Sequence, residues 1–459
     1  MNPDADVVIM GAGLTGLAAA RRLQKEGRQA ILLEQGDRSG GAITTLRQDG
    51  YLLEQGPSTL LRGSPLLETI LAETGLLDEL CPPNPSARRR YVVRRGQPCP
   101  LPSSPVSFLF SSWLSGAGKW RLLREPLARR GTDALRQNET VAAFTRRRLG
   151  PEVLDYGVNP FVSGIYAGDP ENLSARLAFP RLYEAESRGG SLLRGFIRMA
   201  REARKARGKT PRPPRGTISF REGLAALPRA LERGLTQPIR YGERLQSITR
   251  DGTAWSVVTS RQTYRTANVL LTSWNPAWAE AAPSPPGGSW PAIAMSAVQV
   301  VNLGYARSTV DHPLDGFGIL VPACENLPFL GVIFASSLFP GRAPEGNVLL
   351  NLFLGGARSP EAASASEEEI RKTILPAVHH LLGIRAEPVF LATRQWDPAI
   401  PQYTPDHEAF LDARTAWEGA HPGLFLAGTS VDGISMPQAL ESGDRAAAKI
   451  LARLSGETP

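Results

Sequence analysis

The sequence predicts an α/β fold: a Rossmann-like dinucleotide-binding domain, discontinuous along the chain, combined with an α+β substrate domain built on a mixed sheet and with a helical domain. Three observations predict it. A strand at the N-terminus leads into three spaced glycines, a helix and a second strand. Strand-like runs return at 244–272 and at 298–354. The stretch 106–210 has the character of a series of helices.

The first element is a βαβ unit. Residues 6–10 and 30–34 read as strands, and the segment between them reads as a helix with an apolar face that Gly27 closes. Glu34 ends the second strand, where an acidic side chain accepts both ribose hydroxyls of a dinucleotide. The unit therefore predicts a dinucleotide site at the N-terminus.

The glycines of this unit have separate roles. Gly11 allows the tight turn, Gly13 lets the backbone approach a pyrophosphate, and Gly16 lets helix and strand pack closely. Leu14 and Thr15 begin the helix, whose free N–H groups and dipole favour a phosphate. The chain has no second Gly-x-Gly-x-x-Gly, which argues against a separate NADPH domain. Electrons are expected to leave to oxygen or a quinone.

Two more glycine-containing segments indicate which dinucleotide is bound. Gly40 and Gly41 precede the segment 50–58, and far along the chain a strand and turn at 424–433 lead to a helix that starts near Ser435. This pairing resembles the FAD oxidases of the amine oxidase and protoporphyrinogen oxidase superfamily. The positive end of such a helix stabilises the negative charge that reduced flavin carries near N1.

Motif and resemblance together predict a noncovalent FAD site. The family usually has a basic residue after Gly40-Gly41, where this chain has Ala42, and Arg38 is the candidate to replace that phosphate contact. The resemblance also implies that Leu245 lies beside the adenine of the cofactor. The predicted cofactor-binding residues are Gly11, Gly13, Leu14, Thr15, Gly16, Glu34, Gln35, Arg38, Gly40, Gly41, Ala42, Gly56, Pro57, Ser58, Leu245, Trp396, Gly428, Gly433, Ile434 and Ser435.

Composition sets the remaining limits. With 459 residues and 42% hydrophobic composition, the chain is expected to form two or three domains. Its three cysteines and five histidines have no metal-ligand spacing, so no metal is predicted. We expect a cytoplasmic protein, because the N-terminus enters the fold at once and no run reaches the roughly 18 apolar residues of a membrane span.

The positive charge is concentrated in one segment. Of the net charge of +8, nearly all lies in 198–215, which holds eight Lys or Arg and one acid, Glu202. The run is interpreted either as a solvated loop or as a contact with anionic lipid headgroups. The aromatic-rich stretch 102–114 suits a membrane interface or a core. Peripheral association with the inner face of the cell membrane is therefore predicted. Nucleic-acid binding is not, because aromatic residues do not alternate with the basic ones.

The predicted domains are discontinuous. Their expected limits are 1–87, 216–275 and 418–459 for the FAD-binding domain, 88–105 and 276–417 for the substrate domain, and 106–215 for the helical, membrane-associating domain. The elements expected within them are helices at 192–205 and 224–233 and strands at 244–248, 254–259, 268–272, 298–305, 317–321, 331–335 and 348–354.

Within these domains the resemblance narrows to the protoporphyrinogen and coproporphyrinogen oxidases. It rests on the segments 160–174, 179–186, 189–192, 316–322, 336–344, 355–357 and 396–403, in the family's order. A porphyrinogen is a large, mostly apolar macrocycle with carboxylate side chains, which requires aliphatic and aromatic walls and a few cations.

The resemblance assigns five substrate residues. Arg90 matches the arginine that pairs with a propionate, Leu320 and Phe339 match the residues that sandwich the pyrrole rings, and Gly164 and Gly168 lie at the pocket floor. From the residues alone, Arg90 reads equally as a solvated charge among neighbouring arginines, and the two apolar residues read as ordinary core.

The activity implied by the resemblance is the six-electron oxidation of protoporphyrinogen IX to protoporphyrin IX in haem biosynthesis. Each of three rounds moves a hydride from a bridging methylene carbon to flavin N5 and releases a pyrrole N–H proton to solvent, and oxygen reoxidises the FAD, giving peroxide. No catalytic acid or base is predicted. Coproporphyrinogen III oxidation is the first alternative, followed by an amine oxidase and by a non-catalytic flavoprotein partner of a haem-synthesis enzyme. A ferrochelatase and a second copy of the chain are candidate partners.

Overall fold

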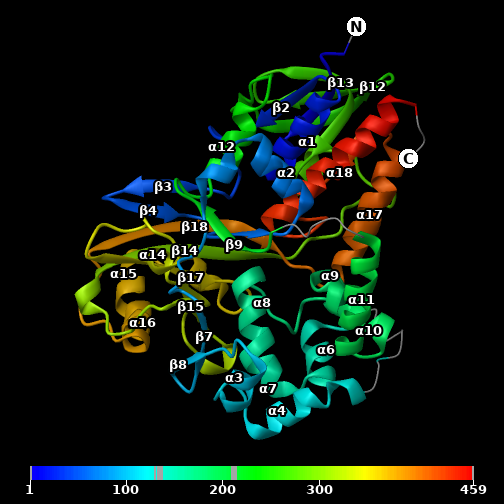
Figure 1. Ribbon diagram of the computed structural model, residues 1–459. Helices are drawn as coiled ribbons and strands as arrows, with labels where there is room; N and C mark the ends of the chain where they lie inside the picture. Colours follow the sequence, from blue (N-terminus) through cyan, green and yellow to red (C-terminus); the bar gives the residue numbers. More distant parts are fainter. Residues whose placement is uncertain (1–2, 129–130, 132–137, 208–213, 457–459) are drawn as a thin grey trace.

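The computed structural model describes residues 3–128, 131, 138–207 and 214–456, and two seven-stranded sheets organise them (Figure 1). In the first sheet, parallel pairing joins β10 to β2, β2 to β1, β1 to β13 and β13 to β19, while β12 and β11 continue antiparallel. Its strands are β1 (Ala5–Met10), β2 (Ala30–Glu34), β10 (Arg240–Tyr241), β11 (Leu245–Asp251), β12 (Ala254–Thr259), β13 (Thr263–Leu271) and β19 (Leu424–Leu426).

Helices cover both faces of this sheet. On one side α1 (Leu14–Lys25), α12 (Ala226–Arg233) and α18 (Met436–Leu454) bury Leu17, Leu227 and Leu440 against it. On the other side α13 (Pro276–Ala281) and α17 (His407–Ala420) bury Trp278 and Trp417. Because both faces are covered, β1 reads as a continuous apolar run instead of an alternating one.

The second sheet is mixed. All neighbouring pairs are antiparallel except β15 and β7. In spatial order its strands are β18 (Phe390–Pro401), β14 (Met295–Ala306), β17 (Asn347–Gly355), β16 (Gly331–Ile333), β15 (Gly316–Leu320), β7 (Arg89–Arg94) and β8 (Gln97–Pro100).

The two faces of this second sheet meet different partners. On β14, Val301, Leu303 and Tyr305 pack against the helices η7 (Ile370–Ile374) and α16 (Leu375–Leu382). The alternate residues of the strand point the other way. On that other face, Leu349 and Phe390 pack against Tyr51 and Leu53 of the hairpin formed by β3 (Thr45–Gln48) and β4 (Tyr51–Glu54). The hairpin therefore links the second sheet to the nucleotide-binding half of the chain.

The described residues between 105 and 207 form a helical region at one end of the molecule (Figure 1). Its described elements are α3 (Pro105–Phe110), α4 (Gly116–Leu123), η2 (Glu125–Leu127), α6 (Val141–Arg148), α7 (Pro151–Val153), η3 (Leu154–Val158), α8 (Asn159–Tyr166), α9 (Ala175–Ala178), α10 (Pro180–Gly189) and α11 (Leu192–Arg207).

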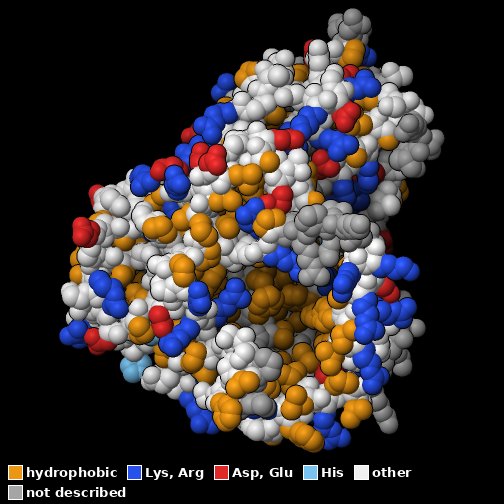
Figure 2. All heavy atoms as spheres, in the orientation of Figure 1, with side chains coloured by type: hydrophobic (Ala, Val, Ile, Leu, Met, Phe, Trp, Pro, Cys, Tyr) orange, Lys and Arg blue, Asp and Glu red, His pale blue; other side chains and the backbone are white. Residues whose placement is uncertain are grey.

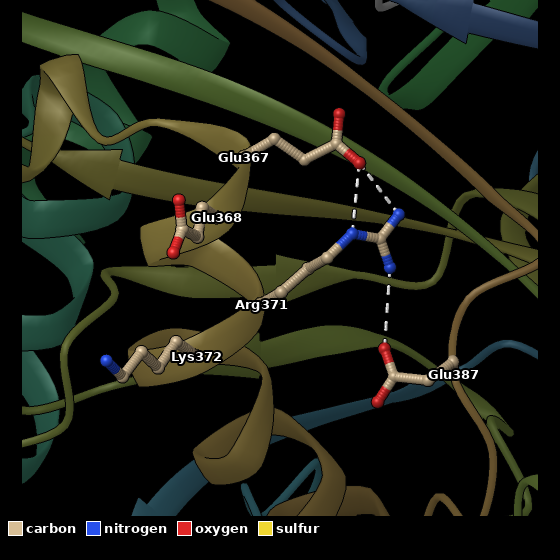
Figure 3. Close-up of a pocket in the computed structure, with 5 residues that line it drawn as sticks. All are labelled: Glu367, Glu368, Arg371, Lys372 and Glu387. Atoms are coloured by element: carbon tan, nitrogen blue, oxygen red, sulfur yellow. Dashed lines mark hydrogen bonds and ion pairs between the residues drawn. The ribbon is translucent and has the colours of Figure 1, made fainter.

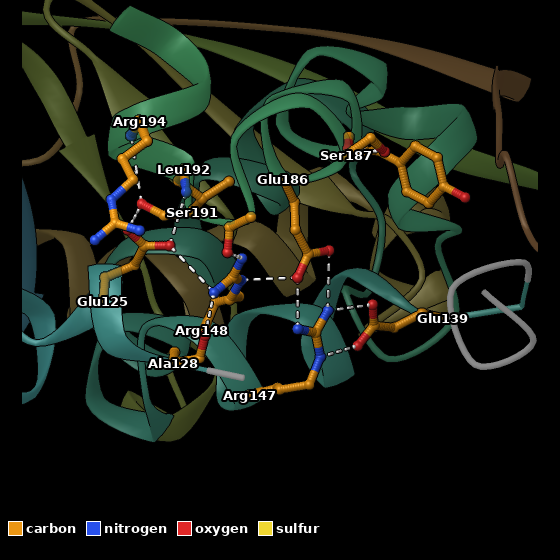
Figure 4. A network of polar contacts seen from close by, with 12 residues as sticks. Glu125, Ala128, Glu139, Arg147, Arg148, Glu186, Ser187, Ser191, Leu192 and Arg194 are labelled. Carbon is orange, nitrogen blue, oxygen red and sulfur yellow. Dashed lines mark hydrogen bonds and ion pairs between the residues drawn. The ribbon is translucent and has the colours of Figure 1, made fainter. Parts of the chain in front are cut away.

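A buried network of charges fixes the start of α11 (Figure 4). Arg148 lies 2.8 Å from Glu186 in an ion pair, and neither side chain is exposed. Glu125 accepts hydrogen bonds from the Leu192 N–H at 2.8 Å and from the Ser191 hydroxyl at 2.9 Å. This carboxylate therefore meets the N-terminal N–H groups of α11, where negative charge is favoured. The arrangement sets the position of α11 relative to α6 and α10.

The mixed α/β class and the expected elements are confirmed. The predicted strand 254–259 coincides with β12, and the other predicted strands and helices overlap observed ones within a few residues. We propose that the first sheet is the centre of the FAD-binding domain and the second sheet that of the substrate domain. The predicted limits of the domains stay a prediction. None of the helices in the described part of the chain combines the length and the apolar composition that a membrane span requires.

Glu54, at the end of β4, provides a test of how the hairpin formed by β3 and β4 is buried. The residue is 4% exposed, and its carboxylate accepts hydrogen bonds from the Thr45 hydroxyl at 2.7 Å and the Leu224 N–H at 2.8 Å. Burial raises the pKa of Glu54 to about 7 from its ordinary value of 4.5, and the two hydrogen bonds offset only part of that effect.

We expect this pKa shift to make the folded protein less stable as pH rises. The group favours the folded state below about pH 4.5, and that contribution is lost as pH passes through about 7, roughly 3 kcal/mol in all. Glu54→Gln removes the titration and keeps a neutral hydrogen-bonding group. In urea unfolding, the free energy of unfolding of wild type should fall between pH 5 and pH 8 relative to that of the variant, which lacks this titration. An identical pH dependence in both proteins would contradict this assignment.

Candidate functional site

The glycine-rich loop between β1 and α1 is shaped for a phosphate. A Cβ at Gly16 would lie 2.0 Å from the Gly11 carbonyl oxygen, so this close contact requires glycine, whereas a Cβ at Gly13 would meet nothing within 4 Å. Gly13 is also the N-cap of α1, and no side chain accepts from the first N–H groups of this helix. The first turn, with Leu14 and Thr15 buried, therefore presents free donors beside open space.

A second loop crosses over the first. The Gly40 N–H donates to the Ala12 carbonyl at 2.8 Å, and a Cβ at Gly41 would lie 3.6 Å from the Gly13 Cα. The Arg38 guanidinium donates to the carbonyls of Ser39, Gly41 and Ile43 at 2.8–3.1 Å. Arg38 therefore shapes this loop, which was not anticipated, and its phosphate contact stays a prediction.

The segment 56–58 lies beside that loop. A Cβ at Gly56 would come within 2.1 Å of the Ala42 carbonyl oxygen, so the two backbones touch. The neighbouring Pro57 and Ser58 are partly exposed. The structure thus gathers the predicted residues of 11–16, 40–42 and 56–58 in one place.

Glu34 stands at the same edge of the sheet. Its carboxylate accepts from the Ala12 N–H at 2.8 Å and from the Gly36 N–H at 2.9 Å. A carboxylate has further lone pairs for hydroxyl groups. Gln35 beside it is exposed.

The C-terminal segment closes this edge. The Gly428 N–H donates to the Ser442 hydroxyl at 2.8 Å, and a Cβ on Gly428 would come within 2.2 Å of the Thr272 carbonyl oxygen. Ser435 caps α18 in a reciprocal capping box with Gln438. The expectation that this helix begins at Ser435 is confirmed. Gly433 adopts a positive φ of 113°, and Ile434 packs towards the helical region.

Tyr403 organises the 429–433 loop, and sequence reasoning gave it no role. Its buried hydroxyl donates to the Thr429 carbonyl at 2.6 Å and accepts from the Gly433 N–H at 2.7 Å. The ring stacks on His407, whose Nε2 lies 2.9 Å from the Ser430 carbonyl. The signal was present, because Tyr403 ends the 396–403 stretch that carries part of the resemblance, but the pattern does not say what the hydroxyl contacts.

Two predicted cofactor residues lie apart from these loops in sequence. Leu245 is buried in the core between the first sheet and α17. Trp396 of β18 donates its indole N–H to the Gln55 carbonyl at 2.6 Å, beside the segment 56–58. Trp396 therefore joins the second sheet to the cofactor loops.

These features fit a flavin dinucleotide. Gly13 and the start of α1 provide donors and space for the phosphates, and Glu34 provides acceptors for a ribose. The N-terminus of α18 begins directly after the 428–435 segment and is suited to a group that becomes negative on reduction.

The arginines at 88–95 differ in whether they form an ion pair with an acidic side chain. Arg89 pairs with Asp315 at 2.7 Å, and Arg94 pairs with Glu152 at 2.6 Å. Arg90 is exposed and lies over the ring of Phe317 at 5.5 Å, with no hydrogen bond or ion pair to a side chain of the described residues. It is therefore a cation that is held by an aromatic ring and available to an anion.

The other predicted substrate residues fall into separate groups. Gly164 of α8 touches Leu320 of β15, since a Cβ there would lie 2.8 Å from a Leu320 methyl carbon. Phe339 is 3% exposed and packs in a cluster that includes Phe317, the residue below Arg90. Gly168 is buried against Gln402. The structure thus joins Gly164 with Leu320 and Phe339 with Arg90, and leaves Gly168 apart.

A hollow lined largely by hydrophobic side chains opens where α8 and α11 lie (Figures 1 and 2). Both helices expose large apolar residues: Phe161, Ile165, Leu193, Phe196 and Ile197. The residues on α11 were not predicted, because the sequence drew attention only to the charges of that helix. Leu320 contacts α8 at Gly164, so the sheet that carries Arg90 adjoins this hollow.

A second depression lies at α15 (Glu367–Glu369) and is lined by charged residues (Figure 3). Arg371 bridges Glu367 at 2.8 Å and Glu387 at 3.4 Å, and Glu368 and Lys372 complete the rim. These are solvated ion pairs of small energetic weight. The depression is far from the glycine loops in Figure 1, and we assign it no role.

Comparisons with known proteins agree with this geometry. A family model described as flavin containing amine oxidoreductase matches residues 14–451. Mitochondrial protoporphyrinogen oxidase of Nicotiana tabacum is 31% identical over 98% of this chain and 95% of that protein. Coproporphyrinogen III oxidase of Bacillus subtilis (strain 168) is 27% identical over 98% of each. A solved structure of a putative protoporphyrinogen oxidase from Exiguobacterium sp. 255-15 is similar with a TM-score of 0.80 and 24% identity, covering 98% of this chain and 99% of that one.

Tyr403→Phe tests the role of the loop that Tyr403 holds. The change leaves the Gly433 N–H and the Thr429 carbonyl without their partner, and a lost buried hydrogen bond costs about 1–3 kcal/mol. We expect flavin affinity to fall about tenfold. The measurement is flavin fluorescence during titration of the apoprotein.

The control for this variant is Tyr305→Phe. Tyr305 is also a buried tyrosine, but its hydroxyl meets His379 on the opposite face of the second sheet. An equal loss of flavin affinity in both variants would mean that Tyr403 acts only through general stability.

Proposed function

The chain belongs to the family of flavin-containing amine oxidoreductases, and from this premise we propose that it oxidises protoporphyrinogen IX to protoporphyrin IX in haem biosynthesis, with FAD as cofactor and oxygen as acceptor. The observation that carries the proposal is an apolar hollow that adjoins the sheet of Arg90, an arginine with no ion pair to a side chain of the described residues. A mostly apolar macrocycle with carboxylate side chains needs both features.

The FAD is proposed to be noncovalent. Residues 429–437, next to which the flavin is expected, contain no cysteine, and Cys81 and Cys99 are buried elsewhere. Gly13 and Gly41 would let the backbone approach the pyrophosphate in the loop that Gly11 and Gly16 shape, and Glu34 would hold the ribose.

The residues of the chain bind and orient the substrate. When bound, FAD would accept a hydride from a bridging methylene carbon and pass the electrons on to oxygen. Arg90 would pair with a propionate, while Leu320 and the apolar side chains of α8 and α11 would hold the ring and exclude water. No side chain is proposed as a catalytic acid or base.

Coproporphyrinogen III is the alternative substrate. It carries four carboxylates instead of two, and the full-length similarity to the enzyme of Bacillus subtilis supports it. Arg95 and Arg181 are exposed, and they are candidates for the extra pairs.

We also propose peripheral contact with an anionic membrane surface. The elements α3, α4 and η2 expose Val106, Phe110, Trp120, Leu123 and Leu127. Four basic residues of α11 are exposed beside the hollow, Arg198, Arg201, Arg204 and Lys205 (Figure 2). Two further basic residues of the run 198–215, Lys209 and Arg212, lie outside the described residues. An apolar end flanked by cations suits a lipid interface. A location at the inner face of the cell membrane, a ferrochelatase partner and a homodimer stay predictions.

The experiment that tests the proposal is a porphyrin fluorescence assay in air. Purified protein with FAD is given protoporphyrinogen or, separately, coproporphyrinogen. We expect a rise that depends on the enzyme and consumes oxygen, and the faster substrate identifies the preference. Rates equal to autoxidation with both would exclude the proposed function, and amines would then be assayed.

Arg90→Ala tests the proposed propionate contact. Loss of a charge-assisted hydrogen bond of about 1.5–3 kcal/mol should raise KM by roughly tenfold or more, while kcat changes little. Arg89→Ala, whose guanidinium already pairs with Asp315, is the neighbouring control and should keep the wild-type KM. An unchanged KM in Arg90→Ala would remove Arg90 from the site.

A further inference from the structure

Two buried asparagines stand side by side on the second sheet without hydrogen-bond partners for most of their polar atoms. Asn302 of β14 pairs in register with Asn351 of β17, and the two are 0% and 1% exposed. Among the described residues, Asn302 Oδ1, Asn302 Nδ2 and Asn351 Oδ1 have no partner. Polar atoms buried in this way normally have a hydrogen-bond partner.

The pair faces the cofactor loops. Asn351 Nδ2 donates to the Ser58 hydroxyl at 3.3 Å. On β14, Asn302 lies four residues from Val298, so these two side chains are on the same face of the sheet. Val298 pairs in register with Trp396 of β18, so Trp396 is on that face as well. Trp396 in turn donates to the Gln55 carbonyl. The unpartnered amides therefore lie on the face that meets the segment 55–58.

The same strand offers a contrast. Gln299 is also buried, at 5% exposure, but alternation places it on the opposite face, where its amide nitrogen donates to the Ala365 carbonyl at 3.1 Å and only its amide oxygen has no partner among the described residues. On the side of the cofactor loops, by contrast, both polar atoms of the Asn302 amide and the Oδ1 of Asn351 have no hydrogen-bond partner among the described residues.

We propose that Asn302 and Asn351, with Ser58, form a polar site that positions the flavin. The site presents donors and acceptors together, so it suits a group that both donates and accepts hydrogen bonds. Two sources have this chemistry: the polar edge of the flavin ring itself, and an ordered water that bridges the amides to the flavin. The inference rests on the proposed FAD cofactor, and neither asparagine acts on the substrate.

The test uses the full-length protein and Asn302→Leu, which keeps the branching of the side chain at Cγ and removes the hydrogen-bonding atoms. Gln299→Leu is the matched control on the same strand. Three quantities are measured for each: the Kd of FAD by titration of apoprotein, the visible absorption spectrum, and the flavin midpoint potential. We expect Asn302→Leu to differ from wild type and Gln299→Leu to match it. If Asn302→Leu does not fold, Asn351→Leu is measured in its place.

The outcomes separate the two sources. A Kd raised about tenfold or more indicates direct contact with the flavin. A Kd within about twofold of wild type, with a shifted spectrum or potential, indicates a bridging water. If wild type retains FAD and Asn302→Leu matches it in all three quantities, this inference fails and the proposed function stands. If wild type binds no FAD, both fail.

Discussion

The parallel pairing of β1 with β13 is the constraint on which the rest of the site depends. It aligns Met10 with Leu271, so the strand ends of two distant segments meet at one edge of the sheet. There the Thr272 hydroxyl lies 2.7 Å from the Met10 carbonyl and 3.1 Å from that of Gly11. The pairing of β13 with β19 brings Gly428 to the same edge. Ligands of open parallel sheets bind at the carboxyl ends of their strands, and this register builds that end from three remote stretches of chain.

A short loop at residues 402–403 connects the helical region to this edge. The Ser174 N–H donates to the Tyr403 carbonyl at 2.8 Å, and the Gln402 amide donates to the Tyr166 carbonyl at 2.8 Å. On its other side, the Tyr403 hydroxyl holds the 429–433 loop. The wall of the hollow and the cofactor loop therefore share a rigid support. A displacement of α8 would move Tyr403 with it, because the connecting groups are buried.

The sequence was sufficient for features set by local pattern. The βαβ unit, the helix start at Ser435 and the strands of both sheets follow from periodicity, glycine spacing and capping residues. Contacts that depend on pairing between remote segments could not be read in this way. The sequence does not show that Arg38 serves the loop carbonyls or that Tyr403 spans two backbone groups. It also does not separate Arg90 from Arg89 and Arg94, because their acidic partners lie 58 or more residues away in the chain.

The treatment of buried polar groups distinguishes supporting structure from site. In the helical region, Glu125, Arg148 and Glu186 are buried together with mutual partners, which fixes a single arrangement of helices. On the second sheet, Asn302 and Asn351 are buried as deeply, yet their partners are incomplete within the described chain. An unpaired buried polar group lowers stability, and Asn302 has both of its amide atoms unpaired among the described residues, on the face of the cofactor loops. The proposed polar site would extend the cofactor site to the interface between β14, β17 and the segment 55–58, although no motif in the sequence marks that interface.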